Sequence, residues 1–233
     1  EKRGSGSAGC DIPGRVGLCD SEEELMQNFF IETSPAEDGI IRLSGADVNH
    51  MKNVLRMKPG ELVQIQDGQG ITYTCRISGY EDREAVLEIL ETKAADTELP
   101  SALYLFQGLP KGDKMEWIVQ KAVELGAAGI IPFAAGRSVV RLDEKKAEKK
   151  TVRWQAIARS AAQQCGRAVI PEVNRPVPFA EALRQASELD VILIPYELER
   201  GMEETAEIIR NIRPGQSVGF FIGAVGGFDA GDL

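Results

Sequence analysis

The stretch that decides the fold is residues 102–133, ALYLFQGLPKGDKMEWIVQKAVELGAAGIIPF. It opens with an apolar run without strict alternation, as expected for a parallel strand that is covered on both faces. A helix should follow, because Asp113 and Glu116 form a D-x-x-E capping box and Gly126 can end the helix. The side chains that we expect to point from this helix into the core are Met115, Ile118, Ala122 and Leu125, together with Trp117. The run GIIPF at 129–133 then predicts a second strand.

Two more apolar runs repeat this pattern, VILIPY at 191–196 and SVGFFIG at 217–223, with helical segments between the runs. Repeated strand and helix units predict a parallel sheet whose ligand sites lie beyond the carboxyl ends of its strands. The loops after these two runs can therefore line one crevice, and the glycines of GAVGGF at 223–228 let the backbone approach a ligand closely. That loop matches neither a GxxxxGK[ST] phosphate loop nor a dinucleotide fingerprint after a first strand, which disfavours ATP hydrolysis and NAD chemistry.

Residues 26–98 predict a different kind of unit, a small β-rich barrel. LVQIQ at 62–66 alternates apolar and polar side chains, and DGQG at 67–70 supplies a turn. ITYTCRI at 71–77 then continues as the opposite strand of a hairpin. The short β-like runs around this hairpin are separated by Gly, Pro and Asp, which is typical of connected strands.

One short helix should interrupt this β-rich unit. Ser44 and Asp47 are its candidate N-caps. The apolar side chains at helical spacing are Val48, Met51, Val54 and Leu55. His50, the only histidine of the chain, falls on this helix. Because no second histidine or clear nucleophile lies nearby in the sequence, we expect no catalytic triad here and interpret His50 as a surface or hydrogen-bonded polar residue.

The composition is that of a water-soluble globular protein, with 43% hydrophobic and 27% charged residues among 233. No apolar run approaches the roughly 20 residues that cross a bilayer. The cysteines, Cys10, Cys19, Cys75 and Cys165, show no CxxC or Cys/His spacing. We therefore expect neither a disulfide nor a metal site, and a reducing cytoplasmic location fits best. Residues 1–25 lack the apolar core of a signal peptide, and we expect a disordered leader that takes no part in the fold.

One segment has the opposite charge to the rest of the chain. The formal net charge of the protein is −9, whereas residues 137–167 hold nine basic and three acidic residues, a local charge of +6. Such a segment can neutralise the phosphates of a nucleic acid. The alternative is a solvated helix face that only keeps the protein soluble.

Five segments in fixed order resemble the RsmE family, the bacterial 16S ribosomal RNA uridine N3-methyltransferases of the SPOUT, or trefoil-knot, class. The segments are NVLRMKPGE at 53–61 with the following DG, KGDKMEWIVQKAVELGAAGIIPF at 111–133, RSVVR at 137–141, RWQAIARSAAQQCGRAVIPEV at 153–173 and FFIGAVGGF at 220–228. The resemblance covers residues 26–233. It implies a PUA-like RNA-binding domain at 26–98 and a SPOUT-like methyltransferase domain at 100–233. It also implies S-adenosylmethionine as methyl donor, a homodimer, and N3 of a uridine in small-subunit RNA as the target.

Methyl transfer is an in-line displacement at a sulfonium, so the protein mainly positions the donor and the base and needs no metal or covalent nucleophile. The uridine N3 must lose its proton, and a guanidinium stabilises the resulting anion. Arg137, in the matched RSVVR block, is the candidate for this catalytic role, although it can equally pair with a phosphate or a carboxylate. Glu197 is the candidate for holding the donor or accepting a proton, although an exposed loop carboxylate without a role fits as well. Cys165 should only pack as a small apolar residue.

The resemblance and the strand ends together suggest two sets of binding residues. Those expected to hold the donor are Pro195, Tyr196, Glu197, Ile222, Gly223, Gly226, Gly227 and Phe228. Those expected to contact RNA are Lys111, Lys114, Arg137, Arg141, Arg159, Gln163 and Arg167.

The sequence departs from the family pattern in the loop after the last strand. Ala224 and Val225 stand where the family has the proline and glutamate of GPEGGF, and Gly136 stands where a glutamate is common. Losing the proline makes the loop more costly to order. Family members continue through a segment similar to LGPRILRTETA that threads the knot and closes the donor pocket, whereas this sequence stops at Leu233. We therefore expect a C-terminally incomplete domain whose knot is in doubt. If the chain truly ends at Leu233, the knot cannot form as in the family, and donor affinity should be weak or absent. If the sequence is a fragment, the activity belongs to the full protein.

These departures leave other functions open. One is a catalytically impaired RNA-binding or dimerisation protein derived from the family. Another is an unrelated small-molecule transferase that uses the strand-end crevice.

Overall fold

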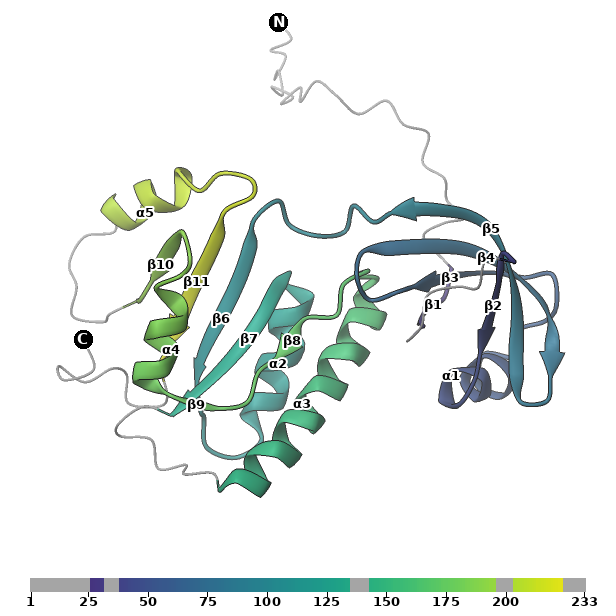
Figure 1. Cartoon of the computed structure of the whole chain (residues 1–233), viewed down its shortest axis with the longest axis horizontal. Helices are drawn as coiled ribbons and strands as arrows, with labels where there is room; N and C mark the ends of the chain where they lie inside the picture. The colour runs from purple at the N-terminus through teal and green to yellow at the C-terminus, as the bar shows by residue number, and fades with distance from the viewer. Residues whose placement is uncertain (1–25, 32–37, 135–142, 196–202, 224–233) are drawn as a thin grey trace, which may run out of the picture.

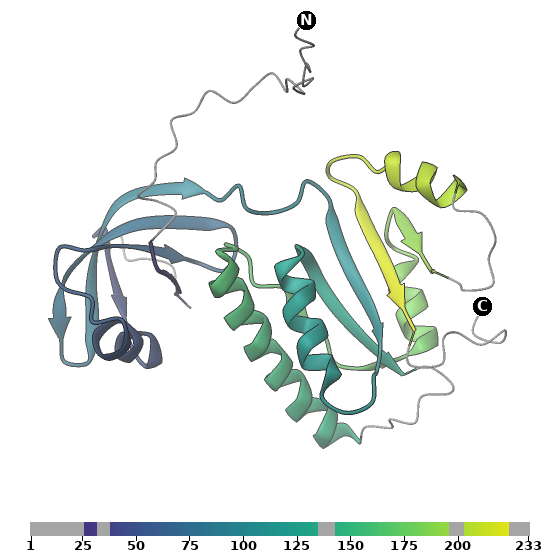
Figure 2. The same cartoon turned by 180° about the vertical axis from the view of Figure 1, so that it is seen from behind.

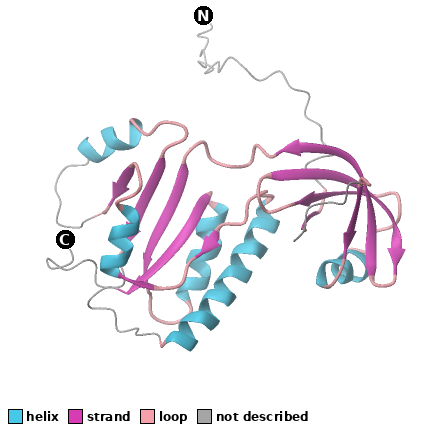
Figure 3. Cartoon of the chain, in the orientation of Figure 1, coloured by secondary structure: helices cyan, strands magenta, loops and turns pink. Residues whose placement is uncertain are grey.

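The computed structural model describes residues 26–31, 38–134, 143–195 and 203–223. Two sheets organise these residues, one of five strands and one of six (Figure 1). Figure 3 shows that the strands of the first sheet lie apart from those of the second and that most helices surround the second. We call the first group, β1 to β5, the β unit, and the second, β6 to β11, the α/β unit. No helix in the described ranges is both long and apolar enough to cross a membrane.

The β unit is a sheet with the strand order β1-β3-β4-β5-β2. Its strands are β1 (Asn28–Phe30), β2 (Ile40–Leu43), β3 (Leu62–Gln66), β4 (Ile71–Glu81) and β5 (Glu84–Ala94). The predicted hairpin is confirmed, since β3 and β4 pair antiparallel from Leu62 opposite Arg76 to Gln66 opposite Thr72. The alternation of LVQIQ has its expected cause, because Val63 and Ile65 are completely buried in the core of this unit.

The helix of the β unit begins differently from our prediction. Helix α1 (Ala46–Asn49) starts after Gly45, whose φ is +76°, and no side chain caps it, so Ser44 and Asp47 are not its caps. It continues as a π-helical turn, η2 (His50–Val54), in which the N–H of Leu55 donates to the carbonyl of His50. The wider turn changes the helical spacing, and Val54 is therefore 63% exposed while Met51 is buried.

The α/β unit is a parallel sheet with the order β10-β11-β6-β7-β8, as the uninterrupted apolar runs predicted. Its strands are β6 (Ala102–Gly108), β7 (Ala127–Ala134), β8 (Glu172–Val173), β9 (Val177–Pro178), β10 (Val191–Leu193) and β11 (Ser217–Ile222). Its helices are α2 (Lys114–Glu124), α3 (Glu144–Cys165), α4 (Phe179–Ala186) and α5 (Glu203–Arg210). Helices α2 and α3 lie together on one side of the sheet and α4 on the other (Figures 1 and 2).

Each face of this sheet has its own core. On the side of α2 and α3, Val119, Ile130 and Ala158 are completely buried in one cluster. On the side of α4, aromatic rings stack, with the ring centroids of Phe106 and Phe221 4.4 Å apart. Two separate cores explain why the strands lack alternation, since both of their faces are covered.

The orientation of α2 differs from the predicted one. Its buried side chains are Met115, Val119, Ala122 and Val123, whereas Trp117 is 64% and Leu125 77% exposed. The predicted core positions of Trp117 and Leu125 were therefore wrong. The capping box was also wrong, because the Asp113 side chain makes no cap hydrogen bond and Glu116 instead pairs with Arg153 of α3 at 2.8 Å. Gly126, with a φ of +93°, does follow the end of the helix.

Candidate functional site

The carboxyl ends of the parallel strands meet at one edge of the α/β sheet, which we call the strand-end edge. Register pairs Ile222 of β11 with Gln107 of β6, and Leu193 of β10 with Phe220 of β11. Ile222 and Gly223 therefore lie beside the last residues of β6, and exposed Pro195 follows the neighbouring β10. These are the described members of the expected donor site, and the structure brings them to the same edge.

The other candidate residues that follow these strands in the sequence lie outside the described residues. These are Arg137 and Arg141 after β7, Tyr196 and Glu197 after β10, and Gly226, Gly227 and Phe228 after β11. The substituted positions Gly136, Ala224 and Val225, and the part of the chain in which a knot would form, fall there too. Their roles stay predictions.

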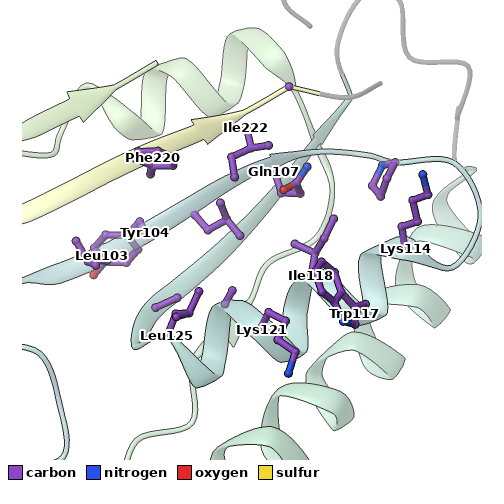
Figure 4. Close-up of a pocket in the computed structure, with 15 residues that line it drawn as sticks. Leu103, Tyr104, Gln107, Lys114, Trp117, Ile118, Lys121, Leu125, Phe220 and Ile222 are labelled. Atoms are coloured by element: carbon purple, nitrogen blue, oxygen red, sulfur yellow. The ribbon is translucent and has the colours of Figure 1, made fainter. Parts of the chain in front are cut away.

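An apolar groove of about 590 Å³ runs from the strand-end edge along the outer side of α2, and we call it the α2 groove. Figure 4 shows Trp117 and Ile118 of α2, with Leu125 directly after it, on one side of the groove and side chains of β6 and β11 on the other. Sequence reasoning missed this surface. The signal was present, since α2 carries more apolar side chains than one core-facing stripe needs.

Two lysines belong to the segment at the end of this groove that meets the strand-end edge. Lys111 and Lys114 are both exposed, and they fall in the loop after β6 and at the start of α2. Lys114 lines the α2 groove together with Gly223. Further along, the Lys121 ammonium lies 2.6 Å from the Glu124 carboxylate, and its hydrogen bond lowers the pKa of that carboxyl. Lys114 is an exposed cation in the same lining as Gly223, and its contact with RNA stays a prediction.

Helix α3 carries the described basic residues of segment 137–167 other than Arg167. Asp143 caps it by accepting from the Lys146 backbone N–H at 2.8 Å, and hydrogen bonds from Lys146 lower the pKa of Asp143. Lys145 and Lys149 are exposed, while Trp154 on the opposite face is buried. The positive charges therefore face solvent, where a polyanion can reach them.

Arg159 and Gln163 lie on the part of α3 that contacts the β unit. The Gln163 side-chain amide donates to the backbone oxygen of Asn28 at 2.7 Å. The Arg159 guanidinium lies 5.7 Å from the centre of the Phe30 ring and donates to the Phe30 carbonyl at 3.4 Å. Both side chains are only partly buried. They hold the two units together and still reach the surface between them.

Arg167 lies in the interior and not on the surface where we predicted it. We predicted an RNA contact, but this side chain is only 5% exposed. Its guanidinium donates to both carboxylate oxygens of Glu98 and to the carbonyls of Val123 and Ala127. Its donors are therefore used inside the protein, and the structure gives Arg167 a structural role at the start of the α/β unit.

The cysteines of the described segments differ in exposure. Cys75 is completely buried, and burial raises the pKa of its thiol to about 12. Cys165 is exposed, so the expectation that it packs in the interior was wrong. Within the described ranges no group of three or more His, Cys, Asp or Glu side chains can hold a metal ion.

Comparison with known proteins covers both units. Residues 97–232 match the family model described as an RNA methyltransferase domain, and residues 43–90 match the one described as an RNA methyltransferase PUA domain. The chain is 35% identical over 214 residues to ribosomal RNA small subunit methyltransferase E of Bacillus subtilis (strain 168), covering 89% of this chain and 84% of the relative.

Solved structures agree with this match. The ribosomal RNA small subunit methyltransferase E of Neisseria gonorrhoeae, bound to S-adenosyl methionine, is 32% identical with a TM-score of 0.73, covering 89% of this chain and 83% of that one. A protein of Legionella pneumophila solved with bound cofactor SAM is 28% identical with a TM-score of 0.75 and the same coverage. The predicted fold class, a SPOUT-type parallel sheet preceded by a small β-rich PUA-like domain, is confirmed. The chain belongs to the RsmE family of ribosomal RNA small subunit methyltransferases.

Proposed function

We propose that this protein transfers a methyl group from S-adenosylmethionine to N3 of a uridine in 16S ribosomal RNA. The observation that carries the proposal is the 32% identical relative from Neisseria gonorrhoeae, which binds S-adenosyl methionine and aligns with 89% of this chain. The described residues fit such a donor, because apolar Ile222 and Pro195 and the backbone of Gly223 meet at the strand-end edge. Apolar side chains with a close backbone approach suit the adenosine part of the molecule.

The reaction requires the protein to position the methyl donor and the uridine and to stabilise the charge that forms on the uracil ring. The donor supplies a methyl group on a sulfonium, and the methyl carbon exchanges its bond to sulfur for a bond to uridine N3. The N3 proton has to leave before or during this exchange, and in our proposal the Glu197 carboxylate accepts it. The Arg137 guanidinium then stabilises the negative charge on the uracil ring. Both residues follow strands whose described ends lie at the strand-end edge.

The proposed domains are a PUA-like RNA-binding domain at 26–98 and a methyltransferase domain at 100–233. We propose that RNA is bound by Lys111 and Lys114 beside the donor site and by Arg159 and Gln163 between the two units. Replacing both Lys111 and Lys114 by alanine should weaken RNA binding and reduce the slope of log K against log salt by about two, since each lysine neutralises about one phosphate. The matched control is Arg184→Ala, which removes an exposed cation of α4, outside the β unit and the proposed RNA contacts. Equal slopes for the double variant and the wild type would argue against these contacts.

We also propose that the protein acts in the cytoplasm as a homodimer that buries the α2 groove. Trp117 and Leu125 are large apolar side chains left at the surface beside Phe220 and Ile222, and such a patch is typical of an interface. Leu125→Glu should then shift the sedimentation coefficient from dimer to monomer, whereas Val152→Glu, on another exposed part of the chain, should not. A wild-type protein that sediments as a monomer at micromolar concentration would refute the dimer.

The direct test of the activity combines calorimetry with S-adenosylmethionine and methyl transfer to 16S ribosomal RNA. Binding together with methyl transfer supports the proposal. The second candidate is an RNA-binding protein without catalysis, and Ala224 and Val225 in place of proline and glutamate favour it. Steeply salt-dependent RNA binding without donor binding would select that candidate.

A further inference from the structure

A polar pocket of about 540 Å³ lies where the β unit meets the C-terminal end of α3, and we call it the junction pocket. Three segments far apart in the sequence form it, and its lining includes Asn28, Phe29, His50, Ser160, Gln163 and Gln164. Figures 1 and 2 both show this end of α3 beside the β unit. The hydrogen bond from Gln163 to the Asn28 backbone and the contact of Arg159 with Phe30 fix the arrangement.

The lining of the junction pocket is polar but uncharged. No described Lys, Arg, Asp or Glu lines it, so neither an anion nor a metal cation finds an opposite charge there. Side-chain amides, a hydroxyl and an imidazole offer donors and acceptors together. The edge of an unpaired nucleobase presents the same mixture, and proteins read such bases by hydrogen bonds and by stacking.

Two further features of the pocket point to a ligand of this kind. The side-chain oxygen of Asn28 is buried and accepts no hydrogen bond from the described part of the chain, which is uncommon for a buried polar atom. The exposed His50 ring meets the buried Phe29 ring edge to face, with centroids 6.0 Å apart. The exposed lining residues Ser160 and Gln164 can therefore offer hydrogen bonds to an incoming base, and the His50 ring offers an aromatic surface at the same place.

A second hollow, of about 580 Å³, follows the junction pocket along β1, and its lining includes Phe30 and three charged residues, Arg42, Asp47 and Arg159. Its two guanidinium groups outnumber its one carboxylate. Arg159 directly precedes Ser160 of the junction pocket on α3. Arg42 faces Glu81 and Glu84 at 3.6 and 3.8 Å, in ion pairs whose side chains are all largely exposed. Exposed ion pairs of this kind contribute little to stability, so a phosphate can take the place of a glutamate carboxylate at the Arg42 guanidinium.

We infer that the junction pocket binds one unpaired base of the RNA substrate, with a neighbouring phosphate at Arg159. The inference rests on the proposed function, since it takes RNA as the substrate. The pocket lies at the end of α3 opposite the strand-end edge, and this helix of 22 residues is about 33 Å long. Within one chain the bound base is therefore not the methylated uridine but a second point of recognition.

The test is a scan with abasic sites. Fragments that tile 16S ribosomal RNA are titrated with the full chain, and the tightest fragment is then made with one base removed at a time while every phosphate is kept. For the wild type, removing the bound base should weaken binding about 5- to 100-fold at one position. The His50→Ala/Gln164→Ala double variant should bind the intact fragment about 5- to 100-fold more weakly than the wild type. Removing the bound base should then weaken the binding of this variant no further. The matched control is Gln69→Ala, an exposed glutamine outside the pocket, which should keep the wild-type profile.

An abasic profile of the double variant that equals the wild-type profile would overturn the inference. A changed sedimentation coefficient with an unchanged profile would also overturn it and would assign the pocket to contact with a second copy. Methyl transfer is measured in parallel to separate the two proposals. Transfer with an unchanged profile contradicts the pocket alone, whereas a base-specific profile without transfer contradicts the methyltransferase proposal alone. A chain that binds no fragment contradicts both.

Discussion

Replacing Arg167 by alanine should destabilise the protein strongly, because this guanidinium is almost completely buried and holds Glu98 and two backbone carbonyls. Removing one partner of a buried ion pair costs about 3–5 kcal/mol. The lower end applies here, since the Glu98 side chain is 29% exposed and can regain water. The Val123 carbonyl also keeps the hydrogen bond from the N–H of Gly126. We therefore expect a loss of about 3 kcal/mol, which lowers the melting temperature by about 6–12 °C.

Urea denaturation followed by circular dichroism measures this loss. The matched control is Arg175→Ala, which removes an exposed arginine paired with Glu148 at 3.4 Å and should cost at most about 1 kcal/mol. The structural role of Arg167 predicts that the folded variant keeps the RNA affinity of the wild type. A loss of less than about 1 kcal/mol, together with weaker RNA binding, would refute this reasoning and restore the RNA contact that the sequence suggested.

Three further predictions concern packing and thiols. Gly219→Ala should cost about 1–3 kcal/mol in urea denaturation, because the new methyl carbon would lie 2.9 Å from Leu189 and 3.1 Å from the Phe106 ring, which is buried and stacked on Phe221. Gly79→Ala meets open space, and equal stabilities of these two variants would contradict the close packing. Because burial raises the pKa of the Cys75 thiol from 9.0 to about 12, the folded state holds this proton more tightly, and stability should be intact below about pH 9 and fall as the pH rises toward 12. Cys75→Ala should lessen that fall, and parallel losses in variant and wild type would disprove its origin in Cys75. In a background without the two cysteines before residue 26, a thiol reagent should label exposed Cys165 in the folded protein and buried Cys75 only in urea, so fast native labelling of both would contradict the structure.

The sequence was sufficient where a local pattern has a single physical meaning. The alternation at 62–66 and the turn that follows predicted the hairpin correctly, because a period of two before a tight turn is characteristic of paired antiparallel strands. The same holds for the parallel strands of the α/β unit, whose apolar runs lack alternation since both faces are covered.

The rest depends on partners that are distant in the sequence. Helix α2 was predicted, but its rotation was not, because Trp117 and Leu125 are as apolar as the side chains that it buries. An arginine at 167 suggested a surface role, since its partner Glu98 lies 69 residues earlier and no local pattern joins them. The junction pocket escaped prediction for the same reason. Asn28 and His50 acquire their neighbours on α3 only through folding.

The position of β11 between β10 and β6 has a consequence for how the protein is made. All strands of the β unit belong to residues 28–94, so that sheet can form early during synthesis. The α/β sheet cannot, because its inner strand β11, Ser217–Ile222, is translated after every other described strand. Until then β6 presents an unpaired edge and β10 has no neighbour to join, which exposes both to proteases and to other chains. Long-range pairing of this kind also slows folding. The arrival of β11 therefore decides when the nascent α/β unit becomes a resistant, folded domain.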